Sequence, residues 1–268
     1  MNKIYVPREG VKKGENGRVL VIGGSKLFHA ASFWSAGMAS RLVDLVHFSS
    51  PAMENNELMR VRAKSKFWDG IVVPWEEVEH YIEEDDVILI GPGMPRDEGL
   101  MEGERATGQI VNELLTKYPE KKWVVDGGAL QEVDPKLLNE NMIITPNRRE
   151  MEILGEKVLT GVTTLYKGEV DVVSCGDVRV EISGGSAGMV KGGTGDVLSG
   201  LVAGLYAKNE AMESAVLASK VCKKAGEKLH AKVGPYYGAS ELMEAVPRVL
   251  WKMVGKDDGK PARTILAG

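Results

Sequence analysis

Cysteine is scarce in this chain, and so are the patterns that accompany structural metal sites. Among 268 residues only Cys175 and Cys222 are present, with no CxxC pair and no cysteine and histidine spacing around them. Their number excludes a disulfide framework, and their spacing gives no support to a structural zinc site. We therefore expect two reduced, buried or half-buried thiols with no chemical role, as in a cytoplasmic protein.

Long apolar runs are also missing. The longest, such as residues 87–90 and 21–24, have the length of a strand, whereas a membrane-spanning helix needs about 20 apolar residues. The first ten residues lack the apolar stretch of a signal peptide or anchor. The sequence thus predicts a cytoplasmic protein without a membrane partner.

The chain also has no excess of positive charge. The formal net charge is -4 and the pI is about 5.7, so the chain has no general attraction for polyanions. Aromatic residues make up 6% of the chain and form no series on which bases would stack. We expect no nucleic-acid partner, and any phosphate site must be built locally.

What the sequence does contain is the alternation of an α/β fold. Short β-branched runs alternate with amphipathic stretches, which is typical of a central, mostly parallel sheet flanked by helices on both faces. Expected strands cover residues 18–22, 45–48, 86–90, 123–125 and 142–144, and two or three antiparallel strands fall within 162–182. Expected helices cover 30–42, 100–118, 135–139, 148–154, 197–206, 210–232 and 240–250. We expect one domain over residues 1–268, with a polar tail at 255–268 to which no structure is assigned.

The most informative segment runs from Gly188 to Gly200, GMVKGGTGDVLSG, a glycine-dense loop that leads into a helix. Glycines let backbone N–H groups converge on an anion, and a helix N-terminus adds unpaired donors and its positive dipole end. Asp196 lies in the first turn, where a carboxylate either caps the helix or accepts a proton from a substrate hydroxyl. The loop matches neither GxxxxGK[ST] nor GxGxxG.

Four further turns follow expected strands, so they should meet at one edge of the sheet and form a binding cleft. They are Gly23-Gly24-Ser25, Gly91-Pro92-Gly93, Asp126-Gly127-Gly128 and Thr145-Pro146-Asn147. Glu150 and Glu152 offer carboxylates for magnesium, although a solvated helix face explains them better. Lys167-Gly168 offers an ammonium and a backbone turn to a nucleotide, or simply a solvated hairpin.

In order, these motifs resemble those of the ribokinase-like NAD(P)HX dehydratases, the family of ADP- or ATP-dependent NAD(P)H-hydrate dehydratases that includes the YjeF C-terminal domain. The resemblance extends from residue 12 to about residue 250. It is carried by KKGENGRVLVIGGS, GPG, VVDGGAL, ITPNRRE, YKG, GGTGD and GASELMEAVP. It implies repair of the hydrates NADHX and NADPHX: a nucleotide phosphorylates the hydroxyl of the hydrate, and loss of phosphate restores the nicotinamide ring.

The resemblance also implies site residues. Asp196 would be the catalytic base, and magnesium would bridge the nucleotide oxygens. The implied nucleotide contacts are Lys167, Gly168, Glu169, Val170, Asp171, Gly192, Gly193, Thr194 and Gly195. The implied hydrate contacts are Ala31, Gly93, Asn147 and Asp196.

Three departures from the family pattern concern these positions. Relatives usually carry His where this chain has Asn147, Gly-Ala where it has Ala30-Ala31, and Thr where it has Asp171. A further departure lies outside the implied contacts, since relatives have Asn where Gly184-Gly185-Ser186 falls. Many relatives also contain an epimerase domain, for which we expect a separate chain here. The choice between ADP and ATP, the preference between NADHX and NADPHX, the metal ligands and the formation of a homo-oligomer stay open.

Two other functions fit the same motifs. A small-molecule kinase of this fold would use the same loop and base on a hydroxymethylpyrimidine, hydroxyethylthiazole or sugar alcohol. A nucleotide-binding regulator without catalysis would bind but not turn over. The motifs before the glycine loop favour the dehydratase, and the presence of Asp196 argues against the regulator.

Overall fold

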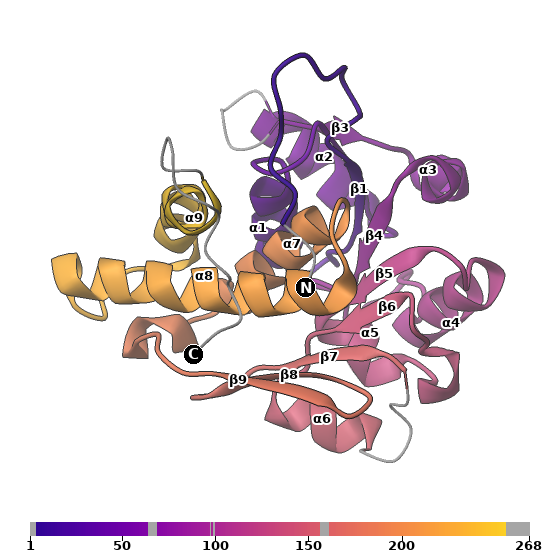
Figure 1. Ribbon diagram of the computed structural model, residues 1–268. Helices are drawn as coiled ribbons and strands as arrows, with labels where there is room; N and C mark the ends of the chain where they lie inside the picture. The colour runs from indigo at the N-terminus through magenta and orange to yellow at the C-terminus, as the bar shows by residue number, and fades with distance from the viewer. Residues whose placement is uncertain (1–3, 64–68, 97, 99, 156–160, 256–268) are drawn as a thin grey trace.

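The computed structural model describes residues 4–63, 69–96, 98, 100–155 and 161–255. In these residues nine strands form one sheet in the order β3-β2-β1-β4-β5-β6-β7-β8-β9 (Figure 1). The strands are β1 (Arg18–Ile22), β2 (Leu45–Ser49), β3 (Ile71–Val72), β4 (Val87–Ile90), β5 (Lys122–Val125), β6 (Met142–Ile144), β7 (Thr163–Tyr166), β8 (Asp171–Cys175) and β9 (Val178–Ile182). Neighbours from β3 to β7 pair in parallel, and β8 and β9 pair antiparallel.

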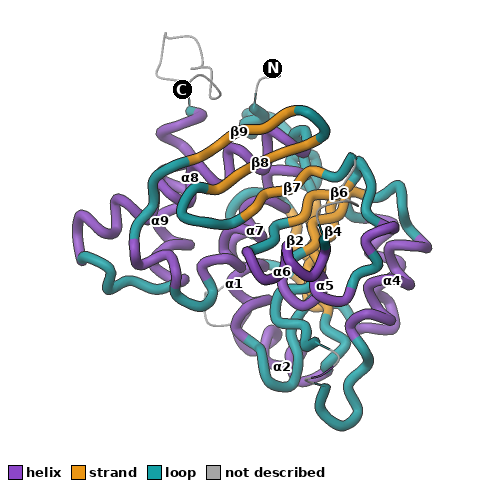
Figure 2. The backbone as a smooth tube through the Cα atoms, turned by 90° about the horizontal axis from the view of Figure 1, so that it is seen from below, coloured by secondary structure: helices purple, strands orange, loops and turns teal. Residues whose placement is uncertain are grey.

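Helices cover both faces of this sheet (Figures 1 and 2). They are α1 (Ala30–Ala39), α2 (Met53–Ala63), α3 (Val78–Glu84), α4 (Thr107–Lys117), α5 (Gly127–Glu132), α6 (Arg148–Leu154), α7 (Thr194–Tyr206), α8 (Ala211–Val233) and α9 (Ala239–Val254), with short 3-10 turns η1 (Trp75–Glu77), η3 (Pro135–Leu137) and η5 (Ala187–Val190). Successive β1 residues point to opposite faces, so Val19 and Val21 join the core under α1, α7, α8 and α9, whereas Leu20 and Ile22 join the core under α3, α4 and α5. The predicted fold class is confirmed.

The pairing of β1 determines where a ligand can bind. β1 lies between β2 and β4, so the chain winds outward from β1 in two directions. In open α/β sheets a crevice forms at such a point, outside the carboxyl ends of the strands. The turns after β1 and β4 therefore form the first part of the expected cleft.

Several predicted boundaries are wrong. The helix expected over 100–118 begins only at Thr107, because Gly103 has a φ of 81° and the preceding residues form turns. The helix expected over 135–139 is the 3-10 turn η3, and α2, α3, α5 and β3 were not predicted. α2 has little amphipathic pattern and α5 is only six residues long, so neither gives a strong periodic signal. Apart from Gly255, the tail 255–268 lies outside the described residues.

Helix α7, which carries Asp196, packs closely against α1. A Cβ on Gly200 would lie 2.4 Å from the carbonyl oxygen of Ser35, and a Cβ on Gly204 would lie 2.8 Å from a methyl carbon of Leu42. The Ser35 hydroxyl also donates a hydrogen bond of 2.9 Å to the carbonyl oxygen of Asp196. The first helix thereby fixes the backbone that presents Asp196.

We expect Gly200→Ala to destabilise the protein by about 1–3 kcal/mol, because its new methyl group meets the backbone of α1. Gly204→Ala should cost less, since it meets the side chain of Leu42, which lies beyond the end of α1. Both substitutions gain the same helix propensity, so the pair isolates the steric cost. Urea denaturation checks this, and a Gly200→Ala variant as stable as the wild type would contradict the described packing.

Candidate active site

The turns after β1 and β4 contact each other directly. The amide of Gly24 donates a hydrogen bond of 2.8 Å to the carbonyl oxygen of Pro92. Gly93 has a φ of 74°, and a Cβ added to it would lie 2.6 Å from the carbonyl oxygen of Phe28 and 3.2 Å from the Cβ of Ala31. The structure thus brings Ala31 and Gly93 together, and only glycine fits at residue 93.

Beside this pair, Asp126 connects the ends of three strands. It follows β5, and its side chain is 3% exposed. Its Oδ1 accepts hydrogen bonds from the Thr145 hydroxyl after β6, at 2.7 Å, and from the Lys167 ammonium after β7, at 2.8 Å. Glu150 Oε2 lies 3.9 Å from the same ammonium. One half-buried lysine therefore faces two carboxylates.

Asn147 and Glu150 form a capping box at the start of α6. Asn147 Oδ1 accepts from the Glu150 amide at 3.1 Å, and Glu150 Oε2 accepts from the Asn147 amide at 2.8 Å. The prediction of a solvated helix face is wrong for Glu150, which is buried, and right for Glu152, which is exposed and pairs with Arg148. Asn147 is exposed at the rim, and its side-chain Nδ2 takes no part in the capping box.

The glycine loop, residues 192–195, leads into α7. Gly193 is the N-cap residue with a φ of 91°, and a Cβ there would lie 2.3 Å from the ring of Trp34. Gly192 has open space around its Cα. The Thr194 hydroxyl donates back to the carbonyl oxygens of Met189 and Lys191, so it holds the loop closed. First-turn amides of a helix lack intrahelical partners, so the loop presents donors to an anion.

Asp196 lies in that first turn, close to Lys167. A Cβ on Gly195 would lie 3.6 Å from the Lys167 ammonium, so this lysine stands between the glycine loop and Asp126. Burial, reinforced by the negative charges of Asp126 and Glu150, raises the pKa of Asp196 to about 7, and Lys167 opposes the rise. A carboxyl group with this pKa can act as a general base near neutral pH.

The same cluster changes the protonation of its other members. Burial raises the pKa of Glu150 above its ordinary value, against the opposing charge of Lys167. Burial lowers the pKa of Lys167, but the carboxylates of Asp126 and Glu150 outweigh it, and the net pKa is raised. Lys167 is therefore a permanent cation among three carboxyl groups.

The lysine turn, residues 167–171, connects β7 to β8. The Lys167 amide donates to the carbonyl oxygen of Pro146 at 2.8 Å, which ties this turn to the start of α6. The Gly168 amide donates to Asp171 Oδ1 at 3.0 Å. Glu169 and Val170 are exposed at the tip, whereas Asp171 is buried.

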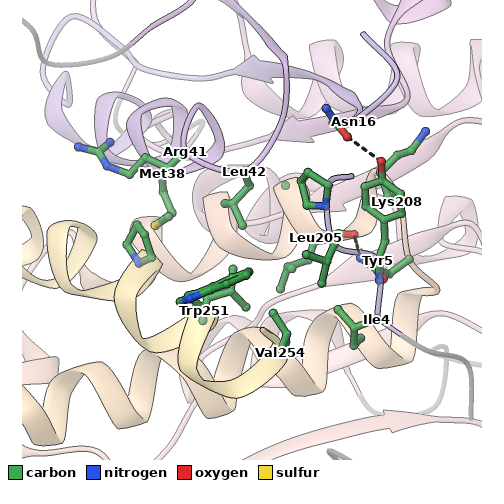
Figure 3. A pocket seen from close by; sticks show the side chains of 16 residues that line it. Ile4, Tyr5, Asn16, Met38, Arg41, Leu42, Leu205, Lys208, Trp251 and Val254 are labelled. Atoms are coloured by element: carbon green, nitrogen blue, oxygen red, sulfur yellow. Dashed lines mark hydrogen bonds between the residues drawn. The ribbon is translucent and has the colours of Figure 1, made fainter. Parts of the chain in front are cut away.

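Two of the cavities in the described part of the chain can be compared with the predicted site. One of about 240 Å³ lies beside the β1 and β4 turns and is lined by Gly24, Lys26, Met94, Arg105 and neighbouring residues. The other, of about 310 Å³, lies at the opposite edge of the sheet, between the N-terminal segment and α1, α7 and α9 (Figure 3). Figure 3 shows Trp251, Leu42 and Leu205 lining it, and no site residue predicted from the sequence lies there.

Sequence reasoning missed two participants. Asp126 was noted only as part of a turn, although an acidic residue directly after a buried strand is a signal for a role at the sheet edge. Lys223 was not noted at all, although it lies on the buried face of α8 with Ser219, Cys222 and Gly226. Both cysteines are free thiols as expected, and burial raises the pKa of Cys222.

Within the described residues, no group of three or more His, Cys, Asp or Glu side chains is arranged to hold a metal ion by itself. No helix in that part of the chain is long and apolar enough to cross a membrane.

Comparison with known proteins places these features in one family. A family model described as NAD(P)H-hydrate dehydratase matches residues 19–248. A bifunctional NAD(P)H-hydrate repair enzyme of Methanocaldococcus jannaschii is 33% identical over 250 residues, covering 89% of this chain and 49% of that protein. An ADP-dependent (S)-NAD(P)H-hydrate dehydratase of Nitrosopumilus maritimus is 32% identical over 278 residues, covering 92% and 94%. The chain spans about half the length of the bifunctional relatives that it matches.

Solved structures agree on the fold. A ribokinase-like superfamily protein of Enterococcus faecalis superposes with a TM-score of 0.77 at 23% identity, covering 93% of this chain and 92% of that one. An ADP/ATP-dependent NAD(P)H-hydrate dehydratase of Bacillus subtilis, co-crystallized with ATP and Mg²⁺, gives a TM-score of 0.73 at 21% identity, covering 92% and 93%.

The raised pKa of Asp196 predicts a stability difference that depends on pH. The folded-state pKa of about 7 exceeds the ordinary value of 3.8, so the native state binds this proton more tightly than the unfolded chain does. The native state therefore loses stability as pH rises from about 4 to about 7. Asp196→Asn should therefore be more stable than the wild type by about 1–3 kcal/mol at pH 8. The difference should shrink as pH falls from about 7 to about 4. Thermal unfolding of both proteins across this range checks it, and a difference independent of pH would contradict the assignment.

Proposed function

The chain belongs to the NAD(P)H-hydrate dehydratase family, and from that premise we propose that it converts hydrated NADH and NADPH back to the reduced coenzymes. The observation that carries the proposal is Asp196, a carboxyl group with a pKa of about 7 at the start of the helix that follows a glycine loop. Family membership favours this reaction over a kinase that releases a stable phosphate ester. The pKa of Asp196 also favours an active enzyme over a nucleotide-binding regulator.

The proposed reaction has two steps, phosphorylation of the hydrate and loss of phosphate. In the first step, Asp196 accepts the proton of the hydrate hydroxyl. The hydroxyl oxygen then bonds to the terminal phosphorus of ADP, and the bond from that phosphorus to the bridging oxygen breaks, which releases AMP. In the second step, the bond from the ring carbon to the phosphate oxygen breaks and phosphate leaves. The neighbouring ring carbon loses a proton, which restores the ring double bond. The sum is hydrate plus ADP giving reduced coenzyme, AMP and phosphate.

We infer that the nucleotide lies between the glycine loop and the lysine turn. Amides of Gly192, Gly193 and Gly195 would stabilise the transferring phosphoryl group, as oriented donors do in other phosphoryl transfers. The Thr194 amide donates to the carbonyl oxygen of Lys191 and would hold the loop in shape. Lys167, a permanent cation 2.8 Å from Asp126, would face the phosphates. The exposed tip residues Gly168, Glu169 and Val170 would contact the rest of the nucleotide.

The residues present fit a magnesium ion bound together with the nucleotide. Asp126, Glu150 and Asp196 outnumber the single ammonium of Lys167, and Mg²⁺ in such sites needs only one or two carboxylates in addition to phosphate oxygens. Glu150 and Asp126 are the residues that we infer would hold it. When bound, the ion would neutralise charge on the phosphates.

The hydrate would lie on the other side of Asp196, against Ala31, Gly93 and the amide group of Asn147. The cavity of about 240 Å³ adjoins Gly24 and would receive a further part of this large substrate. We propose ADP as the donor and the (S)-hydrate as the substrate, because the Nitrosopumilus maritimus relative of matching length is named for both.

Absorbance at 340 nm tests this function. Purified protein, magnesium, hydrated NADH and ADP should restore the absorbance of reduced nicotinamide, and ATP should support a slower rate. Asp196→Asn should lower kcat by about 10²–10⁴-fold, the usual contribution of a general base. The folded state of the variant is checked by its thermal unfolding.

Three outcomes would direct the assignment elsewhere. No recovery with ADP bound would indicate the kinase, to be followed by a screen of small alcohols. Full activity of Asp196→Asn would overturn its role as the base. Faster recovery with ATP than with ADP would overturn the choice of donor alone.

The pH profile of kcat/KM gives a separate prediction. Since Asp196 must be ionised to accept a proton, kcat/KM should rise with pH up to about 7 and level off above it. Lys167→Met removes the charge that lowers the pKa of Asp196, so the rise should move to higher pH. Lys208→Met, an exposed lysine at the opposite edge of the sheet, should leave it unchanged. An unshifted profile in Lys167→Met would contradict the electrostatic coupling.

A further inference from the structure

Lys223 is a buried lysine in the middle of α8. Its side chain is 7% exposed, and its ammonium meets oxygen atoms from two separate loops. It lies 2.9 Å from the carbonyl oxygen of Glu169 and 3.3 Å from that of Gly168, both in the lysine turn. It also lies 3.4 Å from the carbonyl oxygen of Gly184, in the loop after β9.

Asp171 supplies the opposite charge. Its Oδ1 lies 3.4 Å from the Lys223 ammonium and accepts the Gly168 amide, while its Oδ2 accepts the Ser219 hydroxyl of α8 at 2.7 Å. The side chain of Asp171 is 9% exposed, so both members of the pair are shielded from water. A buried pair with its remaining oxygens bonded is the arrangement in which removal of one partner is most damaging.

The pair connects α8 to the lysine turn on one side and to the loop after β9 on the other. Gly184 and Gly185 have φ values of 107° and 91°, and the Gly185 amide donates to Glu227 of α8 at 3.3 Å. Both loops therefore rest on one face of this helix. Lys167, at the start of the lysine turn, contacts Asp126 in the candidate active site.

We propose that Lys223 is a positioning residue for nucleotide binding, which acts by neutralising Asp171 and fixing the carbonyl oxygens of the lysine turn. The proposal rests on the proposed function, because only there does the lysine turn take a nucleotide. The chain places a negative charge near the phosphates and compensates it from α8.

The pair predicts a specific kinetic effect. Without the Lys223 ammonium, Asp171 becomes an uncompensated buried carboxylate beside the turn that would hold a polyanion. The repulsion acts on ADP, whereas the hydrate lies on the other side of Asp196. The KM for ADP should therefore rise, and kcat and the KM for the hydrate should change little.

Three variants test this in the full chain. Lys223→Met removes the charge, and Lys232→Met removes an exposed lysine from the last turn of the same helix as the control. The double variant Asp171→Thr with Lys223→Met removes both charges. Isothermal titration with ADP and magnesium gives Kd without turnover, and steady-state kinetics give kcat and both KM values.

We expect Lys223→Met to raise the Kd and KM for ADP by about tenfold, with kcat within about threefold, as for coupled charged neighbours. The double variant should return the KM for ADP to within about threefold of the wild type. If Lys223→Met does not fold, Asp171→Asn is used, which keeps an oxygen to accept the Gly168 amide. It leaves the Lys223 ammonium unpaired, so the KM for ADP should change in the opposite direction and fall.

Unchanged ADP binding in Lys223→Met or Asp171→Asn would overturn the proposal. A double variant as weak as Lys223→Met would also overturn it, because packing rather than charge would then be responsible. Failure of the wild-type protein to bind ADP would instead overturn the proposed function.

Discussion

One carboxylate oxygen, Oδ1 of Asp126, accepts hydrogen bonds from residues that follow two neighbouring strands. Thr145 donates after β6 and Lys167 donates after β7, while Asp126 itself follows β5. Because this oxygen is buried, it needs both partners, and each partner brings its own loop to the same point. The start of α6, the lysine turn and the glycine loop are positioned around this contact. The chemistry of the site thus depends on a bond within the sheet edge.

Around that contact, acidic side chains outnumber basic ones. The positive charge of Lys167 offsets the charge of Asp126 and only partly stabilises the ionised forms of Glu150 and Asp196. Burial therefore raises the pKa of both Glu150 and Asp196. The buried pair of Lys223 with Asp171 is balanced more closely, with one ammonium facing one carboxylate. Three carboxyl groups around one ammonium, as beside the glycine loop, are an arrangement expected of a site that receives cations and loses protons.

The sequence predicted the sheet and the region of the site well, because strands β1, β4, β5 and β6 are apolar runs followed by turn residues. It predicted Asp196 in the first turn of a helix for a different reason, because a glycine-dense loop comes before it. It could not show that Asn147 and Glu150 cap each other, or that Lys223 reaches across to Asp171, since these contacts join residues whose distance in space is fixed only by packing. Short elements such as α5 and β3 were missed because they carry too few residues for a periodic signal.

The bond from Ser35 to the carbonyl oxygen of Asp196 spans 161 positions of the chain. During synthesis all nine described strands precede α7 in the chain, so the residues of the sheet are made before Asp196. Contacts of such long sequence separation close slowly, because the entropy of a large loop is lost before they contribute. The contact that holds the backbone of Asp196 against α1 is therefore expected to form late, after the strands that it faces.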